Sequence, residues 1–208
     1  MPVRLVHWSL AALIAFSWWS VHNHHTDWHI WSGCAILTLL IFRILWGVFG
    51  SSTARFSNFI RGPRSILADI KGKWTGVGHS PLGGLSVVAL FAAIGLQVGL
   101  GLVAQDDDGL YLGPLARLIS SDNSDRAREL HETWFNVLLG LIVLHIAAIV
   151  FYRLRGRSLT KPMVTGRARI EPGLAPMRAG KWWVSILCLA AGIGITRWVI
   201  AGAPPLGS

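Results

Sequence analysis

The stretch LHETWFNVLLGLIVLHIAAIVFY, residues 130–152, decides the fold class. It is apolar enough to cross a membrane, yet it carries two histidines, His131 and His145, fourteen positions apart. At ~100° and ~1.5 Å per residue, both imidazoles leave one face of a helix, ~21 Å apart and near the two edges of a hydrocarbon core ~30 Å thick. Ionisable side chains in membrane helices are rare and usually functional, and imidazole is a common axial ligand of haem iron. The pattern favours two stacked haem sites; the alternative is two satisfied core histidines.

Composition places the whole chain among integral membrane proteins. Its 208 residues are 52% hydrophobic and only 14% charged, and the mean hydropathy is +0.51. The net charge of +9 does not indicate a nucleic-acid partner, because the charges lie in segments that flank apolar runs, where membrane lipid is the neighbour. Cys34 and Cys188 fall inside apolar runs, which argues against a disulfide framework. No CxxCH motif occurs, which excludes covalent attachment of a c-type haem.

Hydropathy predicts five membrane-spanning helices. We expect them at residues 5–21, 28–49, 82–104, 130–152 and 182–203. The first is not read as a signal peptide, because its apolar run contains His7, Trp18 and Trp19 and no clean cleavage site follows. The segments between the spans are polar, and residues 105–129 are expected to form a loop that begins with QDDDG.

The loop charges predict the orientation. Residues 50–82 and 153–181 are strongly basic, whereas residues 105–129 carry six acidic side chains against three basic ones. The positive-inside rule then puts the N-terminus and both basic segments in the cytoplasm. The acidic loop and the C-terminus face the periplasm, which places the chain in a bacterial inner membrane as a multi-pass protein.

Depth in the membrane sorts the histidines into pairs. The second and fourth spans both enter from outside, so His29 and His131 lie near the outer face. His7 and His145 lie nearer the cytoplasm, and the remaining mismatch in depth is within what helix tilt absorbs. Each pair is a candidate for holding one b-type haem between two helices. Gly33 follows His29 by four positions on the same face, where it leaves room for a porphyrin or for ordinary helix packing.

Several cations and histidines are secondary candidates. Arg43 lies on the face of His29 near the cytoplasmic end, and it is a candidate partner of a haem propionate, as are Arg4 and Arg153. A snorkelling or salt-bridged arginine is the alternative. His79 is a candidate contact of a quinone or a propionate, or a residue of a helix-entry turn. Three further histidines in the outer hinge are read as solvated interfacial residues or as a metal site: His22, His24 and His25.

The order of the motifs resembles one family. The runs are VRLVHWSLAALIAFSW, HIWSGCAILTLLIFRILWGVFG, GHSPLGG, LHETWFNVLLGLIVLH and a basic segment that ends in MVTGRARI. In this order, over residues 3–170, they resemble the prokaryotic cytochrome b561 and nickel–iron hydrogenase b-type cytochrome family. The resemblance implies a four-helix bundle with two haem b groups that exchanges electrons between quinone and a partner. Carried over by position, it implies the haem ligands His7, His29, His131 and His145, and the fifth span is a departure from the four-helix form.

These observations predict an all-α integral membrane protein with a di-haem domain at residues 1–155, followed by a basic segment and a fifth helix at residues 156–208. The leading hypothesis is electron transfer between the quinone pool and a periplasmic redox protein, such as a cytochrome c, a hydrogenase or another dehydrogenase. A superoxide-oxidising quinone reductase is the alternative enzyme; Arg126 and Arg128 would attract the anion, while the acidic loop opposes it. A His-rich metal transporter or a structural membrane protein without haem is the third hypothesis.

Overall fold

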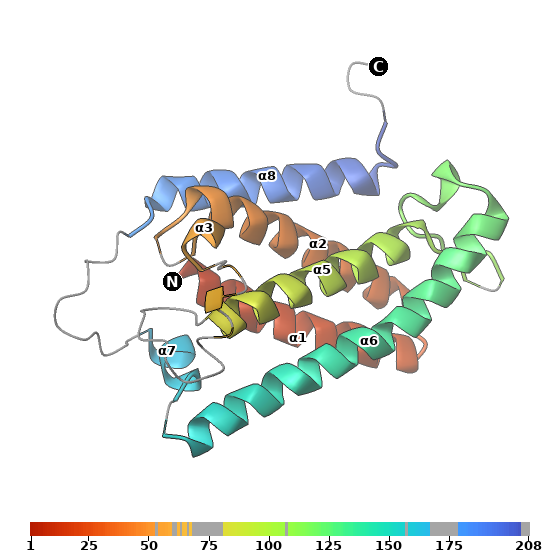
Figure 1. Ribbon diagram of the computed structural model, residues 1–208. Coiled ribbons are helices and arrows are strands. Elements are labelled where there is room, and N and C mark those ends of the chain that lie inside the picture. The colour runs from red at the N-terminus through yellow and green to blue at the C-terminus, as the bar shows by residue number, and fades with distance from the viewer. Residues whose placement is uncertain are drawn as a thin grey trace.

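The chain is built from helices that lie side by side. The computed structural model describes residues 1–52, 54–59, 62, 64–65, 67, 81–106, 108–156, 158–166 and 179–204. Five of the helices in this part are long, namely α1 (Pro2–His22), α2 (Thr26–Phe49), α5 (Pro81–Val103), α6 (Ser121–Leu154) and α8 (Trp182–Ile200) (Figure 1). Short helices occur at α3 (Phe56–Phe59), at the 3-10 turn η1 (Ala116–Leu118) and at α7 (Thr160–Thr165). The predicted all-α class is confirmed, since the described residues contain no strand beyond an isolated bridge between Gln105 and Leu112.

Helix α2 is the centre of the bundle. It packs against α1 on one side, α8 on another and α5 on a third, while α6 packs against α5. α1 and α2 are antiparallel because only Asn23, His24 and His25 join them, and His24 adopts a left-handed conformation with φ of 59°. The apolar core follows this arrangement, and its buried side chains include Leu10, Leu40, Phe42, Trp46, Ile94 and Leu138.

Four of the five long helices are long and apolar enough to cross a membrane. They cover Thr26–Phe49, Leu82–Val103, Ser121–Leu154 and Trp182–Ile200. α1 does not qualify by the same measure of length and composition. Its apolar run is interrupted by His7, by several serines and by tryptophans, and indole side chains favour the membrane interface over the hydrocarbon core. The prediction of membrane-spanning helices is therefore confirmed for four of the five.

The start of α6 corrects the predicted loop at residues 105–129. The helix begins at Ser121, so residues 121–129 extend the histidine helix instead of preceding it. Hydropathy could not show this extension because its sequence, SDNSDRARE, is polar. Asp122 in the first turn favours the helix by interacting with the positive end of its dipole. The irregular connection between α5 and α6 is correspondingly shorter than predicted.

One end of the bundle carries the helix ends that border the basic segments. The N-terminus, the end of α2, the start of α8 and α7 all lie toward the left in Figure 1. Arg4 donates a hydrogen bond to the carbonyl oxygen of Val164 at 2.9 Å, and the indole of Trp8 donates to the carbonyl oxygen of Met163 at 3.2 Å. These two bonds hold α7 against the first turns of α1.

Candidate functional site

Two histidine pairs connect α6 with the first two helices. The imidazole centroids of His7 on α1 and His145 on α6 are 6.3 Å apart. Those of His29 on α2 and His131 on α6 are 5.8 Å apart. These are the same pairs that membrane depth brings together in the sequence, and all four side chains are half-buried.

The spacing within each pair suits a metal ion between the rings. Two trans imidazoles with nitrogens ~2 Å from one metal ion, on rings of ~1.2 Å radius, have centroids ~6.4 Å apart. The observed 6.3 Å and 5.8 Å are close to this value. Ring planes at 51° and 85° to each other are also compatible, because axial imidazoles are free to rotate about the metal–nitrogen bond.

Polar groups of neighbouring helices contact the Nδ1 atoms of the His29–His131 pair. Nδ1 of His131 lies 2.8 Å from the carbonyl oxygen of Gln97, and Nδ1 of His29 lies 3.0 Å from the carbonyl oxygen of Ser17. A carbonyl oxygen can only accept, so Nδ1 of His131 carries the proton and donates it. Nδ1 of His29 also lies 3.0 Å from the hydroxyl oxygen of Ser17, which can either donate or accept. When Nδ1 of a neutral imidazole donates to a carbonyl oxygen, Nε2 keeps a lone pair for a metal ion, the arrangement that is typical of histidine ligands.

The inner pair has an unpartnered nitrogen. Nδ1 of His7 is buried and has no hydrogen-bond partner within the described residues. A buried polar atom without a partner costs free energy unless a ligand or water satisfies it. A water molecule or a ligand polar group beside His7 would satisfy this atom.

Glycines leave space beside His131 and on the helices that carry His29 and His131. A β-carbon at Gly101 would lie 2.9 Å from Cε1 of His131, so only glycine lets α5 approach this ring. A β-carbon at Gly33 or Gly140 would meet nothing within 4 Å. Gly33 therefore does not serve the close helix packing that was one of the two predicted roles, and its open surroundings suit a flat macrocycle.

Helix α6 is poorly covered by the protein itself. It packs against α5, whereas α1 and α6 make no extensive backbone contact although the His7 and His145 rings meet between them. Beyond residue 130, Leu138 is its one fully buried side chain. Because α6 qualifies as a membrane span, membrane lipid accounts for much of this exposed apolar surface. The donor set and the ring spacing of each histidine pair fit a haem group.

The secondary candidates have other contacts. Arg43 is only 3% exposed, donates to the carbonyl oxygen of Ala54 at 3.3 Å, and lies over the rings of Phe56 and Phe91. Arg4 is held by Val164, as described above. Arg153 lines an open cavity of about 610 Å³ together with Lys161 and three hydroxyl side chains of the α7 region. His79 lies outside the described residues.

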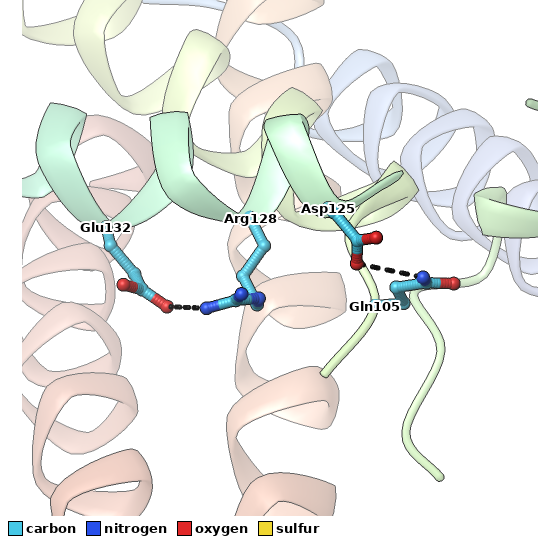
Figure 2. Close-up of polar contacts among 4 residues, drawn as sticks. All are labelled: Gln105, Asp125, Arg128 and Glu132. Carbon is cyan, nitrogen blue, oxygen red and sulfur yellow. Dashed lines mark hydrogen bonds and ion pairs between the residues drawn. The ribbon is translucent and has the colours of Figure 1, made fainter. Parts of the chain in front are cut away.

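Polar side chains at the start of α6 and in the loop before it pair with near neighbours. Arg128 and Glu132 form an ion pair of 3.0 Å one turn apart, and the side-chain amide of Gln105 donates to Asp125 at 2.9 Å (Figure 2). Asp106 accepts a hydrogen bond from the backbone N–H of Tyr111, which closes the turn of the acidic loop. Asp108 is exposed, and Asp107 lies outside the described residues.

The hinge histidines make aromatic contacts. His25 stacks on Trp28 with centroids 4.4 Å apart, and Nδ1 of His22 lies 2.9 Å from the carbonyl oxygen of Trp18. His24 is exposed. Among the described residues, no group of three or more histidine, cysteine or acidic side chains is placed to hold a metal ion. The structure thus gives no support to a metal site in this hinge.

Two contributors to the site were missed from the sequence. Ser17 and Gln97 both contact an imidazole through the main-chain carbonyl, a group that every residue has, and Ser17 also does so through its hydroxyl. A signal did exist for Gln97, because it is the one side-chain amide between Leu82 and Val103. Its Nε2 donates to the carbonyl oxygen of His131 at 3.0 Å, so Gln97 and His131 bond reciprocally between α5 and α6.

Comparison with known proteins identifies a family. The family model described as prokaryotic cytochrome b561 matches residues 1–166, four-fifths of the chain. No curated protein and no solved structure matches the chain. The matched range contains both histidine pairs and ends before α8.

Proposed function

Because the chain belongs to the prokaryotic cytochrome b561 family, it is a membrane-embedded b-type cytochrome that transfers electrons, and we propose that it holds two haem b groups and connects the quinone pool with a periplasmic redox protein. The observation that carries this proposal is that the histidines form two pairs between helices, one between α1 and α6 and the other between α2 and α6. Haem b supplies reversible one-electron chemistry when it is bound between two imidazoles.

Each histidine has a defined task in this proposal. His7 and His145 hold the inner group, while His29 and His131 hold the outer one. The carbonyl oxygens of Ser17 and Gln97 orient the outer imidazoles and increase their basicity by accepting the Nδ1 protons. His131 and His145 leave α6 fourteen residues apart, a separation of ~21 Å along the axis, so the two sites cover most of the membrane thickness.

The proposed topology has five spans with a cytoplasmic N-terminus and a periplasmic C-terminus in a bacterial inner membrane. α1 would be the one span that length and composition do not already indicate, because it is antiparallel to α2 and comparable to it in length. The positive-inside rule supports the orientation. We divide the chain into a di-haem domain at residues 1–155 and a C-terminal part at residues 156–208, although the family match continues to residue 166.

Propionate and quinone contacts are proposed for residues near the inner pair. Arg4 and Arg153 lie toward the end of the bundle that carries His7 and His145, which supports them as propionate partners. The guanidinium group of Arg43 already has cation–π contacts with two aromatic rings. Arg43 is therefore a propionate candidate with less support. His79 is proposed as a quinone contact from its sequence position alone.

The hypothesis of a superoxide-oxidising quinone reductase has little support from the residues at the start of α6. Of the two arginines that would attract the anion, Arg128 is paired with Glu132 (Figure 2), and only Arg126 is left exposed beside the acidic side chains. Such pairing reduces the local positive field that would attract an anion. Electron exchange with a periplasmic protein is therefore the function we favour.

A spectrum with haem quantification tests the proposal. We expect the purified protein to contain two b haems per chain, both low-spin and both removed by acid–acetone, because four imidazoles form two pairs and no CxxCH motif is present. Reduction by a quinol in proteoliposomes should then be visible in the same bands. The variant His24→Ala, at an exposed position outside the pairs, should keep both haems. A stoichiometry of zero or one would contradict the proposal.

A further inference from the structure

A second candidate site lies away from the histidines, where α2 ends and α8 begins. A cavity of about 640 Å³ opens there between the two helices. Apolar side chains line the part of the cavity along the helices, chiefly Leu45, Val184 and Leu187. Polar or cationic side chains line the part at the helix ends, chiefly Ser52, Arg55 and Lys181.

The two cations are held at the mouth of the cavity. Nε of Arg55 donates to the carbonyl oxygen of Gly50, the residue that ends α2, at 3.0 Å. Lys181 is the residue before the first turn of α8, and its ammonium group lies 5.6 Å from the ring centroid of Trp183. Since both helices qualify as membrane spans, their ends mark a membrane surface, and both charges lie at that depth.

The cavity is preformed because α2 and α8 are fixed to each other. Thr38 donates a side-chain hydrogen bond to Thr196 at 2.9 Å. A β-carbon at Gly192 would lie 2.9 Å from the carbonyl oxygen of Thr38, and one at Gly180 would lie 2.7 Å from the Trp46 ring. These glycines permit the close approach of the segments that form the cavity walls.

We propose that this cavity binds one anionic phospholipid, with the phosphate on Arg55 and Lys181 and an acyl chain along Leu45, Val184 and Leu187. Basic pockets between membrane helices at the membrane surface recognise such head groups by charge. A zwitterionic lipid is disfavoured because its own cationic group would meet the same two cations. A quinone head group is neutral and would leave both charges without a counter-ion. The site is formed with α8, which lies beyond the family match, and it includes none of the four histidines.

Native mass spectrometry of the delipidated holoprotein tests this assignment. We expect one phosphatidylglycerol to bind more tightly than phosphatidylcholine with the same acyl chains. The double variant Arg55→Gln/Lys181→Gln should weaken phosphatidylglycerol binding about 30-fold, since each cation near a membrane surface contributes on the order of a fivefold effect. The matched control Arg117→Gln/Arg126→Gln, which removes two exposed cations outside this cavity, should leave binding unchanged.

A second variant tests the contact with the acyl chain separately from the contact with the phosphate charge. Ala191 lines the apolar wall, and Ala191→Phe should reduce phosphatidylglycerol binding with both cations present. Circular dichroism and the haem spectrum should show that each variant is folded. Equal binding of the two lipids, full displacement by inorganic phosphate alone, or tighter binding of a quinone that survives Arg55→Gln/Lys181→Gln would each overturn the proposal.

Discussion

Single residues of α5 determine how His131 is presented. The carbonyl oxygen of Gln97 accepts the Nδ1 proton, the side chain of Gln97 bonds back to the backbone of His131, and Gly101 makes room for the ring. The three contacts fix tautomer, helix register and ring position together. A ligand that is oriented in this way loses little conformational freedom when it binds a metal ion.

Gly101 provides a test at this scale. We expect Gly101→Ala to displace the His131 ring and to remove or loosen the outer haem, because the added β-carbon would lie 2.9 Å from Cε1. About half of the b-type absorbance should be lost or shifted to high-spin. Gly99→Ala is the control on the same helix, since a β-carbon there meets nothing within 4 Å. Equal spectra for the two variants would show that Gly101 does not position the ligand.

At the scale of elements, the four histidines of the candidate site come from three helices. α6 supplies one histidine to each pair, and α1 and α2 supply one each. A group bound across either pair therefore links α6 to the α1–α2 hairpin. Such a link would hold α6 on the side that its packing against α5 does not cover.

The pairing predicts which variants share a spectral component. His7→Ala and His145→Ala should each remove the inner haem, and the double variant should be little worse than either alone, because two ligands of one iron act as a unit. His29→Ala and His131→Ala should likewise remove the outer haem. Redox titration with optical or paramagnetic-resonance detection separates the components. Loss of the same haem in His7→Ala and His131→Ala would refute the pairing.

The contact between α8 and α2 gives a further prediction at the scale of elements. Gly192→Leu should destabilise the protein by ~1–3 kcal/mol, the usual cost of overpacking, because a β-carbon would lie 2.9 Å from the carbonyl oxygen of Thr38. Thermal unfolding in detergent measures the effect, and the haem spectrum should be unchanged because α8 contributes no histidine. Gly194→Leu, on the same helix but with open surroundings, is the matched control. Similar unfolding temperatures for the two variants would contradict this account.

At the scale of the whole molecule, charge is distributed unequally between the two ends. The helix ends that border the basic segments lie toward one end, whereas residues 105–129 hold six acidic side chains against three basic ones. Part of that acidity is used locally, since Asp106 closes its own turn and Asp125 pairs with Gln105. Asp108 stays exposed and available to a partner.

The acidic loop should steer a basic redox partner. Neutralising Asp106, Asp107 and Asp108 to Asn should slow electron exchange with a basic cytochrome c several-fold, most at low salt, where screening is weakest. Asn at position 106 keeps an oxygen that can accept from Tyr111, so the turn should persist. Stopped-flow kinetics at several ionic strengths measure the effect. An unchanged rate with unchanged salt dependence would show that the loop is merely solvated.

The sequence alone determined the helical class, the four apolar spans and the family, because hydropathy and motif order are properties of the chain itself. It also indicated which histidines lie together: a rise of ~1.5 Å per residue in antiparallel spans turns positions 7, 29, 131 and 145 into depths. Tertiary structure alone decided the carbonyl partners of the imidazoles, the need for Gly101 beside His131, the contacts of Arg43 and the cavity beside α8. These features depend on how neighbouring helices are rotated and how closely they approach each other. Hydropathy and charge patterns cannot predict them, because main-chain carbonyls occur at every residue and the role of a glycine depends on which atoms face it.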